Sequence, residues 1–148
     1  MGVRDEVNQA IKAAMIAKDK LTLQTLRMVS AAFKQIEVDK RVEISDEIAR
    51  RELVRLLKQR QESARQFREA NRLDLAEQEE AEITVIQRFL PAALSETEMK
   101  ALVDRLVADS GLPRTMASMR ALMDLVRPQL EGRADLGQVG QYLRSLLT

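Results

Sequence analysis

The chain of 148 residues contains no cysteine and no histidine. Their absence excludes disulfides, thiolate nucleophiles, imidazole bases and the usual zinc ligand sets. Carboxylates alone can hold Mg²⁺, but the acidic run from Glu77 to Glu82 is more typical of a solvated helix face. Neither a metal nor a cofactor is therefore expected.

Glycine and aromatic residues are also scarce, with 5 Gly and 3% aromatics. No glycine-rich phosphate loop opens a helix after a strand, and the serines have no histidine or Ser-x-x-Lys lysine to activate them. The chain is not expected to be an enzyme in its own right. Because the core must be built from aliphatic residues and 7 Met, the composition favours a helix bundle.

No charge of one sign dominates, since 24 Lys and Arg nearly balance 23 Asp and Glu. A nucleic-acid surface would need local segregation of charge, and no DNA partner is expected. The first residues lack the pattern of a secretory signal, and no apolar run of 18 residues occurs. These features predict a cytoplasmic protein with no membrane partner.

Helical periodicity recurs along the whole chain and predicts an all-α fold. A unit of about four helices is expected over residues 1–92, with helices near 4–17, 21–38, 46–70 and 75–90. In the second of these, one stripe holds Leu21, Thr25, Met28, Ala32 and Ile36, and the opposite side carries Arg27, Ser30 and Lys34.

A small three-helix unit is expected over residues 93–148. Ser95 and Glu98 form a capping box that marks its first helix. A second helix is predicted near 115–127, where Pro128 bends or stops it. Asp135 caps the last helix, which runs to about residue 147.

The third helix has an arginine, Arg60, in the middle of its apolar arc. The arc comprises Leu53, Leu56, Leu57, Ala64 and Phe67. In the fourth helix, Glu82 likewise falls in the middle of the apolar arc. If the two helices form a hairpin, both residues lie at nearly equal distances from the turn. A buried charge needs a partner, so we expect a structural ion pair between Arg60 and Glu82.

The predicted hairpin separates its charges, with arginines before the turn and acids after it. Mutual neutralisation along two packed helices is the favoured interpretation, and a line of cations facing a phosphate backbone is the alternative. That line comprises Arg51, Arg55, Lys58 and Arg65. In the last unit, Asp124 lies between Arg120 and Arg127, so a salt-bridged solvent face is expected there too.

Four strings carry a resemblance to a known family. They are TLRMVSAAF from Thr25, RELVRLLKQRQES from Arg51, EITVIQRFLPAALSETE from Glu82 and EGRADLGQVGQYLRSLL from Glu131. Together they resemble the YqeY family over essentially the whole chain. That family is similar to the carboxy-terminal tail domain of GatB, the B subunit of the amidotransferase that converts mischarged Asp-tRNA or Glu-tRNA to the amide.

The resemblance implies a non-catalytic accessory protein whose partner is tRNA, with aminoacyl-tRNA or amidotransferase components as further candidates. The family is associated with carbon–nitrogen ligase activity, but the chain corresponds to the tail alone. The expected phosphate contacts are Arg120, Arg127 and Arg133, with Arg27 and Lys34 in addition. The alternative is a helical adaptor that binds a protein partner and no RNA.

Overall fold

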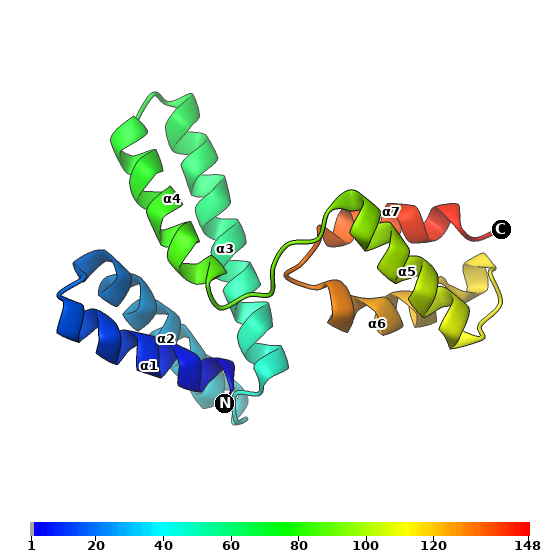
Figure 1. The fold of residues 1–148 in the computed structure, drawn as a ribbon, viewed down its shortest axis with the longest axis horizontal. Coiled ribbons are helices and arrows are strands. Elements are labelled where there is room, and N and C mark those ends of the chain that lie inside the picture. Colours follow the sequence, from blue (N-terminus) through cyan, green and yellow to red (C-terminus); the bar gives the residue numbers. More distant parts are fainter. Residues whose placement is uncertain (1) are drawn as a thin grey trace. The chain divides into compact units, whose positions relative to one another are not determined.

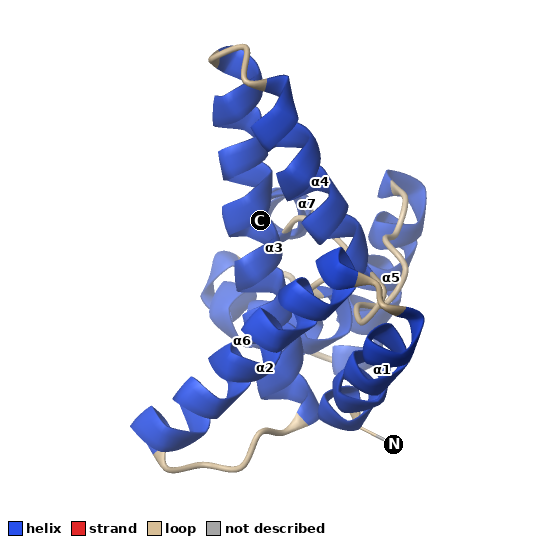
Figure 2. Cartoon of the chain, turned by 90° about the vertical axis from the view of Figure 1, so that its left-hand side faces the viewer, coloured by secondary structure: helices blue, strands red, loops and turns tan. Residues whose placement is uncertain are grey.

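The computed structural model describes residues 2–148 and confirms the all-α fold, since that range contains helices and no strand. Figure 2 shows helices and connecting loops only. The chain divides into two compact units, the first ending at Leu90 and the second beginning at Pro91. The sequence analysis had placed this boundary after residue 92.

The first unit consists of two helical hairpins (Figure 1). Its helices are α1 (Val3–Ala17), α2 (Lys20–Lys40), α3 (Asp46–Glu69) and α4 (Leu73–Gln87). The Asp19 carboxylate caps α2 by accepting from the Thr22 amide, and the Ser45 hydroxyl caps α3 by accepting from Ile48. The Asp46 carboxylate also accepts from the Val3 amide at 2.9 Å, so the start of α3 caps the start of α1.

The core of the first unit corrects the expected apolar stripe of α2. The buried side chains of α2 are Thr22, Thr25, Leu26, Val29 and Phe33. Of the stripe predicted from the sequence, Thr25 is buried, whereas Met28 and Ala32 pack only at the edge of the core. The helix contacts α1, α3 and α4, so its buried face is turned and widened relative to that stripe.

The second unit contains α5 (Glu96–Ser110), α6 (Met119–Leu130) and α7 (Leu136–Ser145), with a 3₁₀ turn at Met116–Ser118 before α6. The capping box of Ser95 and Glu98 is present, and Asp135 caps α7.

Pro128 lies inside α6, which continues to Leu130, so the proline does not stop the helix. Pro128 removes a single backbone hydrogen bond near the helix end. Burial of Leu130, which is 0% exposed, favours the extra turn.

Among residues 2–148, none of the helices combines the length and apolarity needed to cross a bilayer.

Candidate functional site

The structure brings Arg60 and Glu82 together across the α3–α4 hairpin. Arg60 Nε lies 3.3 Å from Glu82 Oε2, and the two side chains are 14% and 21% exposed. The guanidinium also donates to the Leu56 carbonyl at 3.2 Å and contacts the Met28 sulfur on α2. Arg60 Nε itself is buried and makes no hydrogen bond with the described residues, so the pair is held by charge rather than by ideal geometry.

A second carboxylate, Glu79, lies close to this pair. Its pKa is raised above the ordinary glutamate value, mainly because burial penalises the charged form, and also because the Glu82 carboxylate repels its charge. The charge of Arg60 acts in the opposite direction but does not cancel these effects. Because its pKa is raised, Glu79 keeps its proton to a higher pH than an ordinary glutamate does.

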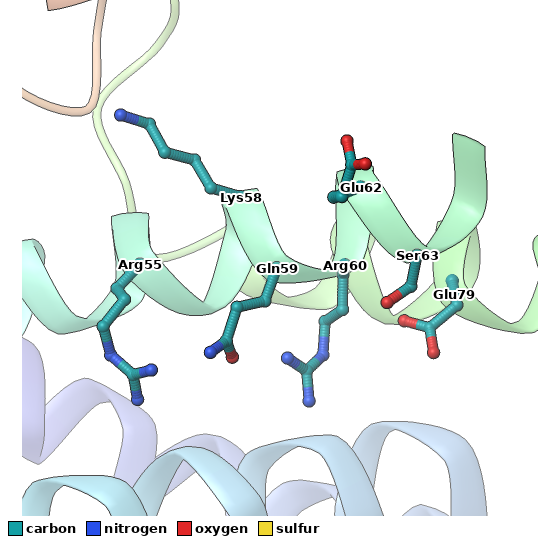
Figure 3. Close-up of a pocket in the computed structure, with 7 residues that line it drawn as sticks. All are labelled: Arg55, Lys58, Gln59, Arg60, Glu62, Ser63 and Glu79. Carbon is teal, nitrogen blue, oxygen red and sulfur yellow. The ribbon is translucent and has the colours of Figure 1, made fainter. Parts of the chain in front are cut away.

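Arg60 and Glu79 border an open groove of about 700 Å³, whose lining side chains are drawn in Figure 3. Its lining residues are Arg55, Lys58, Gln59, Arg60, Glu62, Ser63 and Glu79. In Figure 3, Arg55, Gln59 and Arg60 point to one side of α3, whereas Lys58 and Glu62 point to the other. The groove thus mixes both signs of charge and selects neither anions nor cations by charge alone.

Three of the six arginines of α3 are paired with acids on the same helix. Their ion pairs are Arg51–Glu47, Arg55–Glu52, Arg65–Glu62 and Arg65–Glu69. The one cross-hairpin surface pair among the described residues is Arg68–Glu80, with Nε and Oε1 2.6 Å apart. Most ion pairs of the α3 arginines therefore form within α3, whereas the sequence favoured mutual neutralisation of the two packed helices. Three of the four cations in the possible phosphate-facing line already have carboxylate partners.

Arg27 and Lys34 are both exposed on α2. Arg27 Nη2 lies 3.8 Å from the Met15 sulfur of α1. The charge of Lys34 helps to lower the pKa of Glu37, although the main cause is the hydrogen bond that Glu37 accepts from Arg4. These two cations lie in the first unit, and the other three candidates lie in the second.

Arg120, Arg127 and Arg133 form no ion pair with any residue that the structure describes, so the expected salt-bridged face around Asp124 is not formed. Arg120 is exposed near the start of α6, and Arg127 is half-buried two turns later on the same helix. Arg133 is half-buried in the α6–α7 loop, where its Nε has no hydrogen-bond partner within residues 2–148.

Carboxylates of the second unit are engaged by neutral donors instead. Glu98 accepts from the Ser95 amide, Asp135 from the Gln138 amide, and Asp104 from the Tyr142 hydroxyl at 2.6 Å. The Ser95 hydrogen bonds are the main cause of the lowered pKa of Glu98, and the charge of Arg133 contributes to it. These carboxylates therefore accept hydrogen bonds from cap amides and a hydroxyl, and within the described residues they form no ion pair with the arginines of the unit.

Three further arginines are as free as the candidates but were not singled out from the sequence. Arg105, Arg114 and Arg144 are exposed and form no ion pair within the described part of the chain. Within residues 2–148, all six arginines of the second unit thus lack a salt bridge. In the first unit, seven arginines have one: Arg4, Arg51, Arg55, Arg60, Arg65, Arg68 and Arg72.

A smaller pocket of about 360 Å³ lies between α5 and α7, lined by Glu96, Met99, Lys100, Gln138, Gln141 and Tyr142. The Lys100 ammonium lies 5.4 Å from the centroid of the Tyr142 ring and pairs with Glu96 at 3.1 Å. The single tyrosine of the chain therefore already has a cation over its ring.

No group of three or more Asp and Glu side chains is arranged to hold a metal ion in the range that the structure describes.

Comparison with known proteins gives a family for the whole fold. Residues 4–147 match the model of the family described as YqeY, Yqey-like protein. Relatives named "Altered inheritance of mitochondria protein 41, mitochondrial" occur in yeasts. The protein of Lachancea thermotolerans is 40% identical over 67% of this chain and 54% of its own length. That of Kluyveromyces lactis is 34% identical over 70% of this chain and 57% of its own length.

The chain thus spans about half the length of the curated relatives it matches. Their names also overturn one expectation from the sequence. A cytoplasmic location was predicted, and it is contradicted because the relatives in Lachancea thermotolerans, Clavispora lusitaniae and Kluyveromyces lactis are named as mitochondrial proteins. The family assignment itself is as the sequence strings predicted, and with 144 of 148 positions inside the matched range 4–147, the chain belongs to the YqeY-like family.

Proposed function

We propose that the chain is a non-catalytic RNA-binding accessory factor whose second unit contacts the phosphate backbone of tRNA. One observation carries the proposal: among the described residues, the six arginines of the second unit have no carboxylate partner, whereas seven of the eleven arginines of the first unit have one. An unshared guanidinium binds phosphate without first breaking an ion pair, and its planar fork matches phosphate oxygens.

Arg120 and Arg127 form the centre of the proposed contact. They lie seven residues apart on α6, about 10 Å along the axis, and therefore on one face of the helix. The first turn of α6 contains no acidic residue, so the positive end of the helix dipole adds to the charge of Arg120. Arg133, in the following loop, extends the same set. These groups contact backbone rather than base edges, so recognition depends on RNA shape.

Arg27 and Lys34 are additional candidate contacts on the first unit, since both are exposed and neither forms an ion pair with a described residue. The similarity of the family to the GatB tail supports tRNA as the RNA class and amidotransferase components as the assembly that the factor serves. The protein then delivers or positions tRNA and leaves amide formation to the assembly.

The test is binding of the full chain to unmodified tRNA, measured by fluorescence anisotropy over a range of salt. The double variant Arg120→Gln/Arg127→Gln is expected to weaken binding and to lower the salt slope by roughly one for each lost phosphate contact. The matched control is Arg65→Gln, because Arg65 is exposed but already paired with Glu62 and Glu69. No binding at low salt, or an equal loss in the control, would refute the proposal.

A third variant tests the role of unshared charge directly. Asp124→Glu adds one methylene to the carboxylate between Arg120 and Arg127, which brings it within reach of both guanidinium groups. The substitution leaves all arginines in place and is expected to weaken tRNA binding by neutralising them. Unchanged affinity would show that pairing does not limit RNA binding.

The second candidate function is a protein adaptor, and exposed apolar residues on the second unit favour it. Met116 is 50% exposed and Leu125 is 42% exposed. An apolar contact through these side chains changes little with salt, whereas tRNA binding weakens steeply. The salt series therefore separates the two functions.

A further inference from the structure

The turn that joins α1 to α2 exposes two neighbouring apolar side chains. Ile16 is 84% exposed and Met15 is 46% exposed. The turn between α1 and α2 lies at the end of this hairpin away from the N-terminus (Figure 1). Lys12, Met15 and Ile16 follow the three- and four-residue spacing of one helix face. Val7 and Ala14 are buried on the other face of α1, so packing within the unit leaves Ile16 in water.

The same turn has a strong excess of positive charge. From residue 11 to residue 27 there are four cations, Lys12, Lys18, Lys20 and Arg27, and one carboxylate, Asp19. None of these four cations forms an ion pair with a described residue. Arg27 contacts the Met15 sulfur, which places its charge beside the apolar pair.

Asp19, the cap of α2, offsets one of these four charges and leaves an excess of three. Its carboxylate accepts from the Thr22 amide at 3.2 Å and from the Thr22 hydroxyl at 2.7 Å. These bonds lower its pKa, and the charge of Arg88 lowers it further, so a second cation-bearing segment adds to the positive potential of the turn. We call Lys12, Met15, Ile16, Lys18, Lys20 and Arg27 the basic tip.

Apolar side chains surrounded by cations match the boundary between lipid headgroups and acyl chains. A nucleic acid would satisfy the cations but would leave Ile16 in water, because an aliphatic side chain gives a base no π face for stacking. We propose that the basic tip binds the surface of an anionic lipid bilayer, with Ile16 and Met15 entering the headgroup boundary. No membrane partner was expected from the sequence. That expectation rested on the lack of a long apolar run, which a peripheral contact of this kind does not need.

The proposal predicts co-sedimentation of the full chain with phosphatidylcholine vesicles that contain phosphatidylserine, and not with pure phosphatidylcholine vesicles. Each lysine near an anionic surface contributes about fivefold in affinity, so Lys18→Gln/Lys20→Gln is expected to weaken vesicle binding about 25-fold. Ile16→Gln is expected to weaken it about threefold with the charge unchanged.

The matched control is Val38→Gln on α2. Val38 is 65% exposed and apolar, but Glu37 and Asp39 flank it instead of lysines. The control is expected to bind vesicles like the unaltered chain. All these positions are exposed, and an unchanged far-UV circular dichroism spectrum checks that each variant folds.

Three results would overturn the proposal. The first is equal sedimentation with both kinds of vesicle, and the second is equal loss in Ile16→Gln and Val38→Gln. The third is loss of tRNA affinity in the lysine variant with vesicle binding intact, which would assign the basic tip to RNA. The arginines of the second unit are unchanged in these variants, so failure here leaves the tRNA proposal to its own test.

Discussion

Replacing Glu82 with Gln tests whether the Arg60–Glu82 pair stabilises the first unit. The substitution keeps the shape of the side chain but removes the charge that faces Arg60, 3.3 Å away. Breaking a fully buried pair costs about 3–5 kcal/mol, because one charge is left without a partner. Both side chains retain some exposure, and Arg60 still donates to the Leu56 carbonyl, so we expect a smaller loss of about 2 kcal/mol.

The two units can be followed separately in the same sample. The chain has one tyrosine and no tryptophan, and that tyrosine, Tyr142, lies in the second unit. Tyrosine fluorescence therefore reports unfolding of the second unit, and far-UV circular dichroism reports both. For a unit of this size, 2 kcal/mol corresponds to a fall of roughly 10 °C in Tm. We expect the fall in Tm in the unfolding transition of the first unit, which circular dichroism detects and tyrosine fluorescence does not.

The control is Glu80→Gln, which removes the partner of Arg68 in the same hairpin. That pair is 41–49% exposed, so its loss is expected to cost less than about 1 kcal/mol. If Glu82→Gln destabilises the protein no more than Glu80→Gln does, the buried pair does not contribute as we argue. A double variant with Arg60→Met is expected to recover part of the stability, because no unpaired charge remains.

Three other predictions concern local features. Glu79→Gln is expected to stabilise the first unit by less than about 0.5 kcal/mol at neutral pH. The pKa of Glu79 is raised in the folded state, so the protonated form, which the fold favours, is lost as the pH rises through that pKa. Below about pH 4 Glu79 is protonated in the folded and unfolded states alike, so Gln should then give no benefit. Urea titrations at neutral pH and below about pH 4 would show this difference. Lys18→Gly is expected to raise the free energy of unfolding by up to about 1 kcal/mol, because Lys18 ends α1 with φ 58°, and a lower urea midpoint would contradict this. Ser95→Ala is expected to cost the second unit about 1 kcal/mol through loss of the α5 cap, visible in Tyr142 fluorescence.

Local signals in the sequence identified most of the helix ends. Ser45, Ser95 and Asp135 were read as caps, and each accepts a backbone hydrogen bond in the structure. Such bonds depend on residues within three positions, so a single sequence contains the information. Pro128 shows the limit, because the burial of Leu130 decides whether one missing hydrogen bond ends α6.

Packing between helices was harder to predict. The wheel of α3 placed Leu53, Leu56 and Ala64 on the buried face, as found, because α3 has one main neighbour. Leu57 and Phe67, which it placed on the same arc, are half-buried. The wheel of α2 missed Leu26, Val29 and Phe33, which are fully buried. Because α2 contacts three helices of the first unit, its periodicity alone does not say where the centre of the buried face lies.

The charges that decide the proposed function show why spacing is insufficient. Glu47–Arg51 and Glu62–Arg65 place the acid first, the order that favours pairing along a helix, and both pairs form in α3. Arg65 and Glu69 pair in the reverse order as well, whereas Arg120 and Asp124, which has a shorter acidic side chain, do not pair within the described residues. The helix α3 carries five acids beside its cations, whereas Asp124 is the one acid of α6. The availability of a cation for phosphate therefore follows from the number and length of the acidic side chains near it on its helix rather than from the net charge of the chain.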